Sequence, residues 1–161
     1  MTGTPARLNI HATGLVLDGI GLAIRGPSGA GKSLLALELL DRYRLEGRRG
    51  LLVADDRLDL ERRDDGLVMQ APANLAGLIE LRGRGIVRRP QVGSARLDLI
   101  VDLVDDLVRM LEVSELTTDL MGAELPRCPV PRRGVIDAGH QLLLVREALA
   151  ALPSTARQKT T

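Results

Sequence analysis

A glycine-rich octapeptide restricts the fold of this chain more than any other feature of the sequence. Residues 26–33 read Gly-Pro-Ser-Gly-Ala-Gly-Lys-Ser and match the pattern G-x-x-x-x-G-K-[ST]. An apolar run of strand length precedes them, and leucines at helical spacing follow Gly31. Glycines let the backbone fold into a concave nest of converging N–H groups, so this strand, loop and helix predict a phosphate-binding site.

The octapeptide is expected to bind a nucleoside triphosphate together with Mg²⁺. All eight residues are candidate nucleotide contacts: Gly26, Pro27, Ser28, Gly29, Ala30, Gly31, Lys32 and Ser33. Lys32 would reach the outer phosphates as a point charge, and the Ser33 hydroxyl would complete the coordination shell of a bridging Mg²⁺ ion. The N-terminus of the following helix adds a partial positive charge. An ordinary glycine-rich turn is the structural alternative.

Two adjacent acids and one histidine are candidates for the chemical step. Asp55 and Asp56 follow the apolar run 51–54, which suits a strand covered on both faces. Because like charges repel, adjacent acids there favour contact with a cation or a role in proton transfer, and the alternative is a solvated turn. A lone histidine in a strand, such as His11, is more often structural than catalytic. A hairpin next to the strand that precedes the phosphate loop would bring His11 to Asp55.

Charge is distributed unevenly along the second half of the chain. Residues 80–96 hold five arginines and a single acid, Glu80, whereas residues 97–124 hold eight acids and a single base, Arg109. The basic segment can be interpreted as a loop that brings Glu80 to a metal ion and arginines to phosphate or an acidic partner. The alternative is a strand followed by a solvated loop.

Local patterns predict two hairpins and one further strand. Asp18-Gly19 is a turn-forming dipeptide within residues 8–25, and residues 58–69 alternate around a second aspartate–glycine turn. Residues 97–104 alternate apolar and acidic side chains, which predicts a half-exposed strand.

Helical spacing predicts one helix from Gly31 to Gly47 and a closing amphipathic helix over residues 138–152. With the predicted strands, these helices indicate an α/β fold. We expect one catalytic domain over residues 1–152 and a polar tail over residues 153–161.

Composition excludes several classes of function. The chain has 161 residues, a formal net charge of +1 and one aromatic residue, Tyr43, so we expect no nucleic-acid partner that stacks bases on aromatic rings. No apolar run approaches the ~20 residues of a membrane span, and we expect no membrane partner. Cys128 is the single cysteine, and no signal-peptide pattern is visible, so a cytoplasmic location is expected.

Four segments together resemble the catalytic domain of HPr kinase/phosphorylase. They are His11-Ala12, the octapeptide 26–33, residues 52–57 (Leu-Val-Ala-Asp-Asp-Arg) and residues 79–86 (Ile-Glu-Leu-Arg-Gly-Arg-Gly-Ile). Members of this bacterial family use ATP to phosphorylate a serine of HPr, the phosphocarrier of the sugar phosphotransferase system, and can remove the phosphate again. The resemblance covers roughly residues 8–150 and implies a short form without the family's amino-terminal domain.

The resemblance also implies a fold and a set of roles. The fold would be of the phosphoenolpyruvate carboxykinase-like phosphate-loop type, with a central mixed sheet and flanking helices. Asp55 becomes the acid/base for the serine hydroxyl and His11 its neighbour, while Lys32 and Ser33 contact phosphate and metal. Asp56 and Glu80 become the carboxylates on the metal side of the site. Arg109, followed by Met110, matches a loop arginine that the family links to dephosphorylation.

We therefore predict an ATP-dependent serine kinase acting on HPr, with phosphorolysis of the phosphoserine, from phosphate to pyrophosphate, as a second activity. The family implies a homo-oligomer, with a hexamer as the candidate form. A small-molecule kinase is one alternative, although such kinases usually carry an arginine-rich lid and residues 97–124 are acidic. A non-catalytic regulator that senses ATP is the other.

Overall fold

The computed structural model describes residues 6–72 and 77–153 of the chain. Its elements in chain order are β1 (Arg7–Ile10), β2 (Ala12–Leu17), β3 (Ile20–Arg25), α1 (Lys32–Leu45), β4 (Gly50–Ala54), β5 (Leu58–Arg63), β6 (Gly66–Gln70), β7 (Leu78–Leu81), β8 (Gly85–Arg88), β9 (Ser94–Arg96), β10 (Leu99–Val104), the 3-10 helix η1 (Val113–Leu116), β11 (Thr117–Leu120), β12 (Ala123–Pro131) and α2 (Ala138–Ala150).

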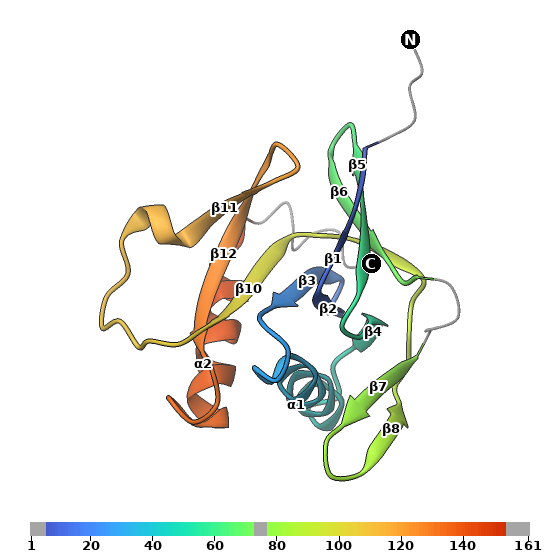
Figure 1. Ribbon diagram of the computed structural model, residues 1–161, viewed down its shortest axis with the longest axis vertical. Helices are drawn as coiled ribbons and strands as arrows, with labels where there is room; N and C mark the ends of the chain where they lie inside the picture. The colour runs from blue at the N-terminus through green and yellow to red at the C-terminus, as the bar shows by residue number, and fades with distance from the viewer. Residues whose placement is uncertain (1–5, 73–76, 154–161) are drawn as a thin grey trace.

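A mixed six-stranded sheet forms the centre of the molecule, with the strand order β11-β12-β10-β3-β2-β4 (Figure 1). Strand β10 runs parallel to both of its neighbours, β3 and β12, whereas β2 runs antiparallel to β3 and β4. The C-terminal ends of β3, β10 and β12 therefore meet at one edge of the sheet. In open α/β sheets this edge is where ligands bind.

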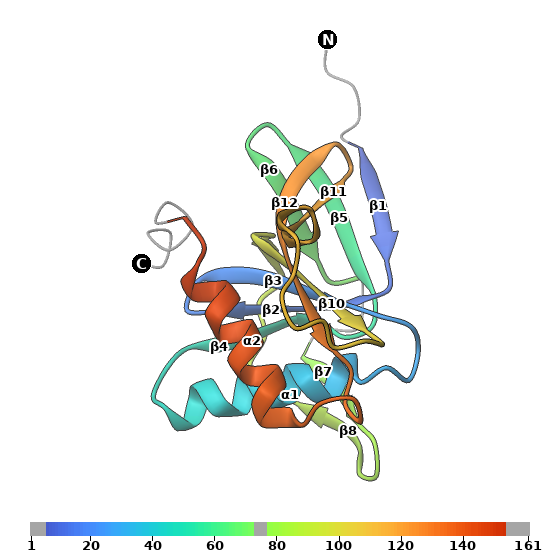
Figure 2. The same cartoon turned by 90° about the vertical axis from the view of Figure 1, so that its left-hand side faces the viewer.

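The two faces of this sheet are covered differently. Both helices pack on one face, where side chains of α1 and α2 join those of β2, β3 and β10 in one buried cluster. The opposite face is covered by a second, four-stranded sheet with the order β1-β5-β6-β9, which closes a separate buried cluster. Figure 2 shows the helices in the lower half of the molecule and the strands β1, β5 and β6 above them. The apolar run of β4 is thus covered on both faces, as predicted.

The two hairpins predicted from turn dipeptides are confirmed. Strands β2 and β3 pair around Asp18 and Gly19, which have φ values of 49° and 79°. Positive φ at both central residues is the conformation that an Asp-Gly hairpin turn requires. Strands β5 and β6 also form a hairpin, around Asp64 and Asp65, with Arg63 paired to Gly66; at this turn it is Gly66 that has a positive φ, of 145°.

Strand β10 differs from the half-exposed strand that the sequence predicted for residues 97–104. It lies between β3 and β12 in the centre of the sheet, and both Ile100 and Val101 are fully buried. Asp102 is not a solvent-facing acid, because Arg25 on β3 and Arg127 on β12 both bond to its carboxylate. Two arginines from neighbouring strands neutralise the acid and allow a central position.

Both predicted helices are present. The helix α1 ends before Gly47, and α2 begins after Asp137, whose carboxylate accepts a hydrogen bond of 2.8 Å from the His140 N–H. Such an N-cap satisfies one of the free N–H groups at the start of a helix. In the described residues, neither helix has the length and apolar character that crossing a membrane would need. The predicted polar tail lies outside the described residues from 154 onward.

Candidate active site

The phosphate loop leaves β3 after Arg25 and enters α1 at Lys32. Gly29 and Gly31 adopt φ values of 82° and 99°, in the left-handed region that favours glycine. Gly31 is also the N-cap of α1, and within residues 6–72 and 77–153 no side chain caps this end of the helix. The first N–H groups of α1 therefore have no acceptor within the helix and are available to an anion.

A cavity of about 400 Å³ opens against this loop. It is lined by Ser28, Gly29, Ala30, Gly31, Lys32, Ser33, Leu34, Asp55, Asp56, Glu80, Leu81, Arg82, Arg132 and Arg133. The structure thus brings the predicted loop, both predicted aspartates and Glu80 to one cavity, although they come from three separate parts of the chain.

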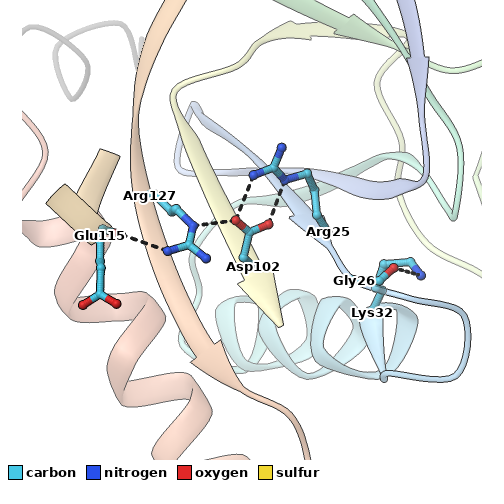
Figure 3. Close-up of polar contacts among 6 residues, drawn as sticks. All are labelled: Arg25, Gly26, Lys32, Asp102, Glu115 and Arg127. Carbon is cyan, nitrogen blue, oxygen red and sulfur yellow. Dashed lines mark hydrogen bonds and ion pairs between the residues drawn. The ribbon is translucent and has the colours of Figure 1, made fainter. Parts of the chain in front are cut away.

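The side chain of Lys32 lies inside the loop and is only 6% exposed. Its ammonium group donates a hydrogen bond to the carbonyl oxygen of Gly26 at 2.8 Å (Figure 3). It also donates to the carbonyl oxygen of Pro27 at 3.2 Å. The same nitrogen lies 3.7 Å from a carboxylate oxygen of Asp56. These contacts hold a positive charge in the wall of the cavity.

Asp55 follows β4 and accepts three hydrogen bonds. Its Oδ1 accepts from the Ser33 hydroxyl at 2.6 Å and from the Thr13 hydroxyl at 2.9 Å. Its Oδ2 accepts from the backbone N–H of Glu80 at 3.1 Å. The carboxylate is therefore fixed by a strand, a helix and a second strand, next to the loop that ends in Ser33.

Asp56 has a different environment from its neighbour. Its backbone adopts a φ of 66°, its N–H donates to the Thr13 hydroxyl at 3.2 Å, and its carbonyl oxygen accepts from the Ala12 N–H at 3.1 Å. The side chain is exposed and reaches toward Lys32. The left-handed backbone thus turns two adjacent acids in different directions, one toward Ser33 and one toward Lys32.

His11 lies between β1 and β2, next to the backbone contact between Ala12 and Asp56. Its side chain is exposed, and no hydrogen bond joins the imidazole to Asp55 in the described part of the chain. From this strand it is Thr13, two residues further on, that bonds to Asp55. The hairpin brings the segment around His11 to Asp55, as expected, but the side chain that bonds to Asp55 is the buried Thr13.

The predicted metal ligands line one cavity without forming a cluster. Among the described residues no group of three or more histidine, cysteine, aspartate or glutamate side chains is arranged to hold a metal ion. The Ser33 hydroxyl bonds to Asp55, and Asp56 lies near Lys32. Mg²⁺ needs hard oxygen ligands and is usually bound through one or two carboxylates together with substrate phosphates. The oxygen donors Ser33, Asp56 and Glu80 fit an ion of this kind.

Arg109 lies in the segment after β10 and lines a different cavity. This second cavity has a volume of about 750 Å³ and is formed by residues 104–111 with parts of η1, β12 and α2. Because β3 and β10 are parallel, the Arg109 segment leaves the same edge of the sheet as the phosphate loop. Among the described residues, Arg109 therefore lines this second cavity and not the cavity of the phosphate loop.

A network of charged side chains connects three neighbouring strands, β3, β10 and β12 (Figure 3). Arg25, the residue before the loop, bonds to Asp102 at 2.7 and 2.8 Å, and Arg127 bonds to the same carboxylate at 2.6 Å. Arg127 also donates to the carbonyl oxygen of Glu115 in η1 at 3.0 Å. Burial opposes the ionisation of Asp102, but the bonds from the two arginines outweigh it and lower the pKa of Asp102 from its ordinary value.

Sequence reasoning missed three residues at this site: Thr13, Arg132 and Arg133. Thr13 is a polar residue in an otherwise apolar strand, and this was the only signal that it gave. Arg132 and Arg133 follow the last strand directly, as Asp55 and Asp56 follow β4. That shared position after a strand was a usable signal for the arginine pair.

Comparison with known proteins assigns the chain to a family. The family model for the HPr Serine kinase C-terminal domain matches residues 5–158. The chain belongs to this family. The HPr kinase/phosphorylase of Lactiplantibacillus plantarum is 34% identical over 156 residues, which cover 89% of this chain and 46% of that protein. The HPr kinase/phosphorylase of Geobacillus kaustophilus is 33% identical over 153 residues, covering 88% and 46%.

This member of the HPr kinase family spans about half the length of the curated relatives it matches. The solved structure of the Hpr(Ser) kinase/phosphatase from Coxiella burnetii superposes with a TM-score of 0.69 at 29% identity, covering 89% of this chain and 88% of that one. The predicted resemblance is confirmed, as is the α/β fold with its central mixed sheet. The helices flank the sheet on one face alone.

Proposed function

We propose that this chain is an ATP-dependent kinase that transfers the terminal phosphoryl group to a serine hydroxyl of HPr. The observation that carries the proposal is Asp55, held by three hydrogen bonds in the wall of the phosphate-loop cavity. A carboxylate fixed beside a phosphate site is the arrangement that proton abstraction from an incoming hydroxyl needs. The kinase family of the relatives supports the same reaction.

In the forward reaction the loop binds the outer phosphates through its N–H groups and through Lys32, whose buried ammonium neutralises their charge. A serine hydroxyl entering the cavity attacks the terminal phosphorus, and Asp55 accepts its proton as the new bond forms. The bond between the terminal phosphorus and the bridging oxygen of ADP breaks. Positioning and charge neutralisation supply most of the catalysis in such transfers.

Ser33, Asp56 and Glu80 would hold a Mg²⁺ ion on the phosphate side of the cavity. The ion would supply neutralisation of the charge on the phosphate oxygens. Asp56 also lies close to Lys32 and limits where the ammonium can move.

The reverse reaction is part of the proposal, with inorganic phosphate as the nucleophile. A phosphate oxygen bound by the loop attacks the phosphorus of phosphoserine, the bond from phosphorus to the serine oxygen breaks, and protonated Asp55 gives its proton to that oxygen. The products are serine and pyrophosphate. Water has no comparable anchor in a nest of N–H groups, so phosphorolysis is expected to exceed hydrolysis.

The test is transfer from radiolabelled ATP to purified HPr, with an HPr variant that has alanine at the phosphorylated serine as the acceptor control. Transfer of the label to wild-type HPr but not to the alanine variant supports the proposal. Label on small alcohols in place of HPr would indicate a small-molecule kinase, and ATP binding without any transfer would indicate a nucleotide sensor. Lys32→Ala should abolish transfer, because the backbone amides of the loop would then hold the outer phosphates without the ammonium charge beside them.

Phosphorolysis is tested by incubating phosphoserine-HPr with the enzyme and Mg²⁺, with and without added phosphate. Pyrophosphate formed only when phosphate is present supports the reverse reaction. Phosphate released at equal rates in both samples would refute it. A homo-oligomeric assembly and a cytoplasmic location belong to the same proposal and are tested by sedimentation and by cell fractionation.

A further inference from the structure

The turn after β12 brings two arginines, Arg132 and Arg133, to the cavity of the phosphate loop. Strand β12 runs parallel to β10, which runs parallel to β3, so the chain leaves all three strands at the same edge of the sheet. The phosphate loop follows β3 and the arginines follow β12. Residues distant in the sequence thus line one cavity with the loop.

We propose that Arg132 and Arg133 are phosphate-binding residues that contact the terminal phosphoryl oxygens of the bound nucleotide, or of pyrophosphate in its place. This inference rests on the proposed nucleotide-binding function and adds two phosphate-contacting residues to that site. Its chemistry is recognition of a phosphate anion by guanidinium groups, which can donate two parallel hydrogen bonds to adjacent oxygens.

The charges around the cavity favour such a ligand. Four cationic side chains line it, Lys32, Arg82, Arg132 and Arg133, against three carboxylates, Asp55, Asp56 and Glu80. Lys32 is occupied by carbonyl oxygens of the loop, whereas the side chains of Arg132 and Arg133 are 49% and 37% exposed. The two arginines, like the exposed Arg82, can therefore direct their donors to an anion in the cavity.

Each arginine now bonds to a carboxylate that an anion could displace. The Arg132 Nε donates to Asp105 at 2.9 Å, and Asp105 is 81% exposed. The Arg133 guanidinium contacts Glu38 of α1 at 3.5 Å. Ion pairs between exposed side chains contribute little free energy in water, whereas a phosphate offers more charge and more acceptor oxygens than a carboxylate. A bound phosphate can therefore take over these donors at little cost.

Asp105 provides a selective test, because it competes with the ligand for Arg132. The binding of pyrophosphate and of ATP is measured by isothermal titration calorimetry on the full chain, with Mg²⁺ present for ATP. Arg132→Ala should weaken both affinities about tenfold, the usual effect of losing a charge-assisted hydrogen bond. Asp105→Asn should tighten pyrophosphate binding by about two- to fivefold, because Arg132 is freed. The double variant should bind like Arg132→Ala.

Arg146→Ala is the matched control, since Arg146 is a comparably exposed arginine paired with Glu46, and neither residue lines the cavity. Its affinities should equal those of the wild type. Thermal unfolding of each variant shows whether the domain stays folded, and Arg132→Lys, which keeps the charge but not the paired donors, should bind with intermediate affinity.

Different failures are distinguishable in this experiment. Wild-type affinity in both Arg132→Ala and Arg133→Ala would overturn the inference and leave the proposed kinase intact. Weaker binding in Asp105→Asn would also overturn it, because the ion pair would then support the site instead of competing with the ligand. A wild-type chain that binds neither pyrophosphate nor ATP would overturn the proposed function and this inference together.

Discussion

Thr13→Val removes one hydroxyl from beneath the candidate active site and leaves the shape of the side chain nearly unchanged. Thr13 is fully buried, donates to Asp55 at 2.9 Å and accepts from the Asp56 N–H at 3.2 Å. Valine can do neither. Asp55 would keep its bonds from Ser33 and from the Glu80 N–H, so its position would loosen without being lost.

The expected loss of stability follows from these two bonds. A hydrogen bond to a charged group contributes about 1.5–3 kcal/mol, and a buried N–H without an acceptor costs about 1–3 kcal/mol. Because the two bonds share one hydroxyl, their effects overlap, and we expect the free energy of unfolding to fall by about 2 kcal/mol in total. For a chain of 161 residues this corresponds to a decrease in Tm of about 4–8 °C.

The expected kinetic effect is a tenfold decrease in kcat, or about 1.4 kcal/mol in the activation barrier. The KM for ATP should change little, because Thr13 does not line the cavity. The assay is steady-state phosphorylation of HPr, combined with thermal unfolding. Thr118→Val is the matched control, since Thr118 is a half-buried threonine of β11 away from the cavity.

Two results would refute this reasoning. If Thr13→Val and Thr118→Val have the same Tm and the same kcat, the hydroxyl of Thr13 supports neither the fold nor Asp55. If instead the KM for ATP rises while kcat stays constant, Asp55 acts in nucleotide binding, and its assignment as the proton acceptor is wrong.

Four further predictions concern single residues. Asp55→Asn should keep ATP binding and reduce transfer by about 10²-fold, with Asp59→Asn as a control; a parallel loss of ATP binding would make Asp55 a metal ligand. Arg109→Ala should impair dephosphorylation more than phosphorylation, and equal losses in one preparation would contradict this. The lowered pKa of Asp102 implies stability that is present above about pH 3.9 and is lost as the pH falls through the folded-state pKa. The difference in unfolding free energy between wild type and Asp102→Asn in urea should therefore shrink from pH 7 to pH 3, and a constant difference would refute the role of the ion pairs. Burial raises the pKa of the Cys128 thiol to about 12, so a thiol reagent at pH 8 should react only after unfolding, and rapid labelling of the native chain would contradict this.

Local sequence patterns determined much of the fold. The turn at Asp18 and Gly19 depends on backbone conformations that few residues tolerate, and the loop around Gly29 and Gly31 depends on the same property. Helical spacing of leucines marked α1 because residues three and four apart share one face of a helix. These features are encoded by residues close together in the chain, so they could be predicted without knowledge of the tertiary structure.

The environment of the reactive groups was decided by strand order. Thr13 and Asp55 are 42 residues apart, and Arg25 and Asp102 are 77 apart, yet each pair is joined by a hydrogen bond. The periodicity of apolar residues indicates which of them share one face of a helix or strand, but it does not show which strands become neighbours in the sheet. For this reason the sequence indicated a half-exposed strand where β10 is central, and it singled out His11 where Thr13 makes the contact with Asp55.

The place of the arginine pair after β12 was likewise decided by the tertiary structure and not by local sequence. In the sequence, Arg132 and Arg133 lie far from the phosphate loop, and their position directly after a strand does not show that this strand ends beside the loop. Only the parallel pairing of β3, β10 and β12 brings their ends to one edge of the sheet, and with them the loop and the arginines. The physical reason is that hydrogen bonds between strands form across any sequence separation, whereas spacing within the chain constrains only near neighbours.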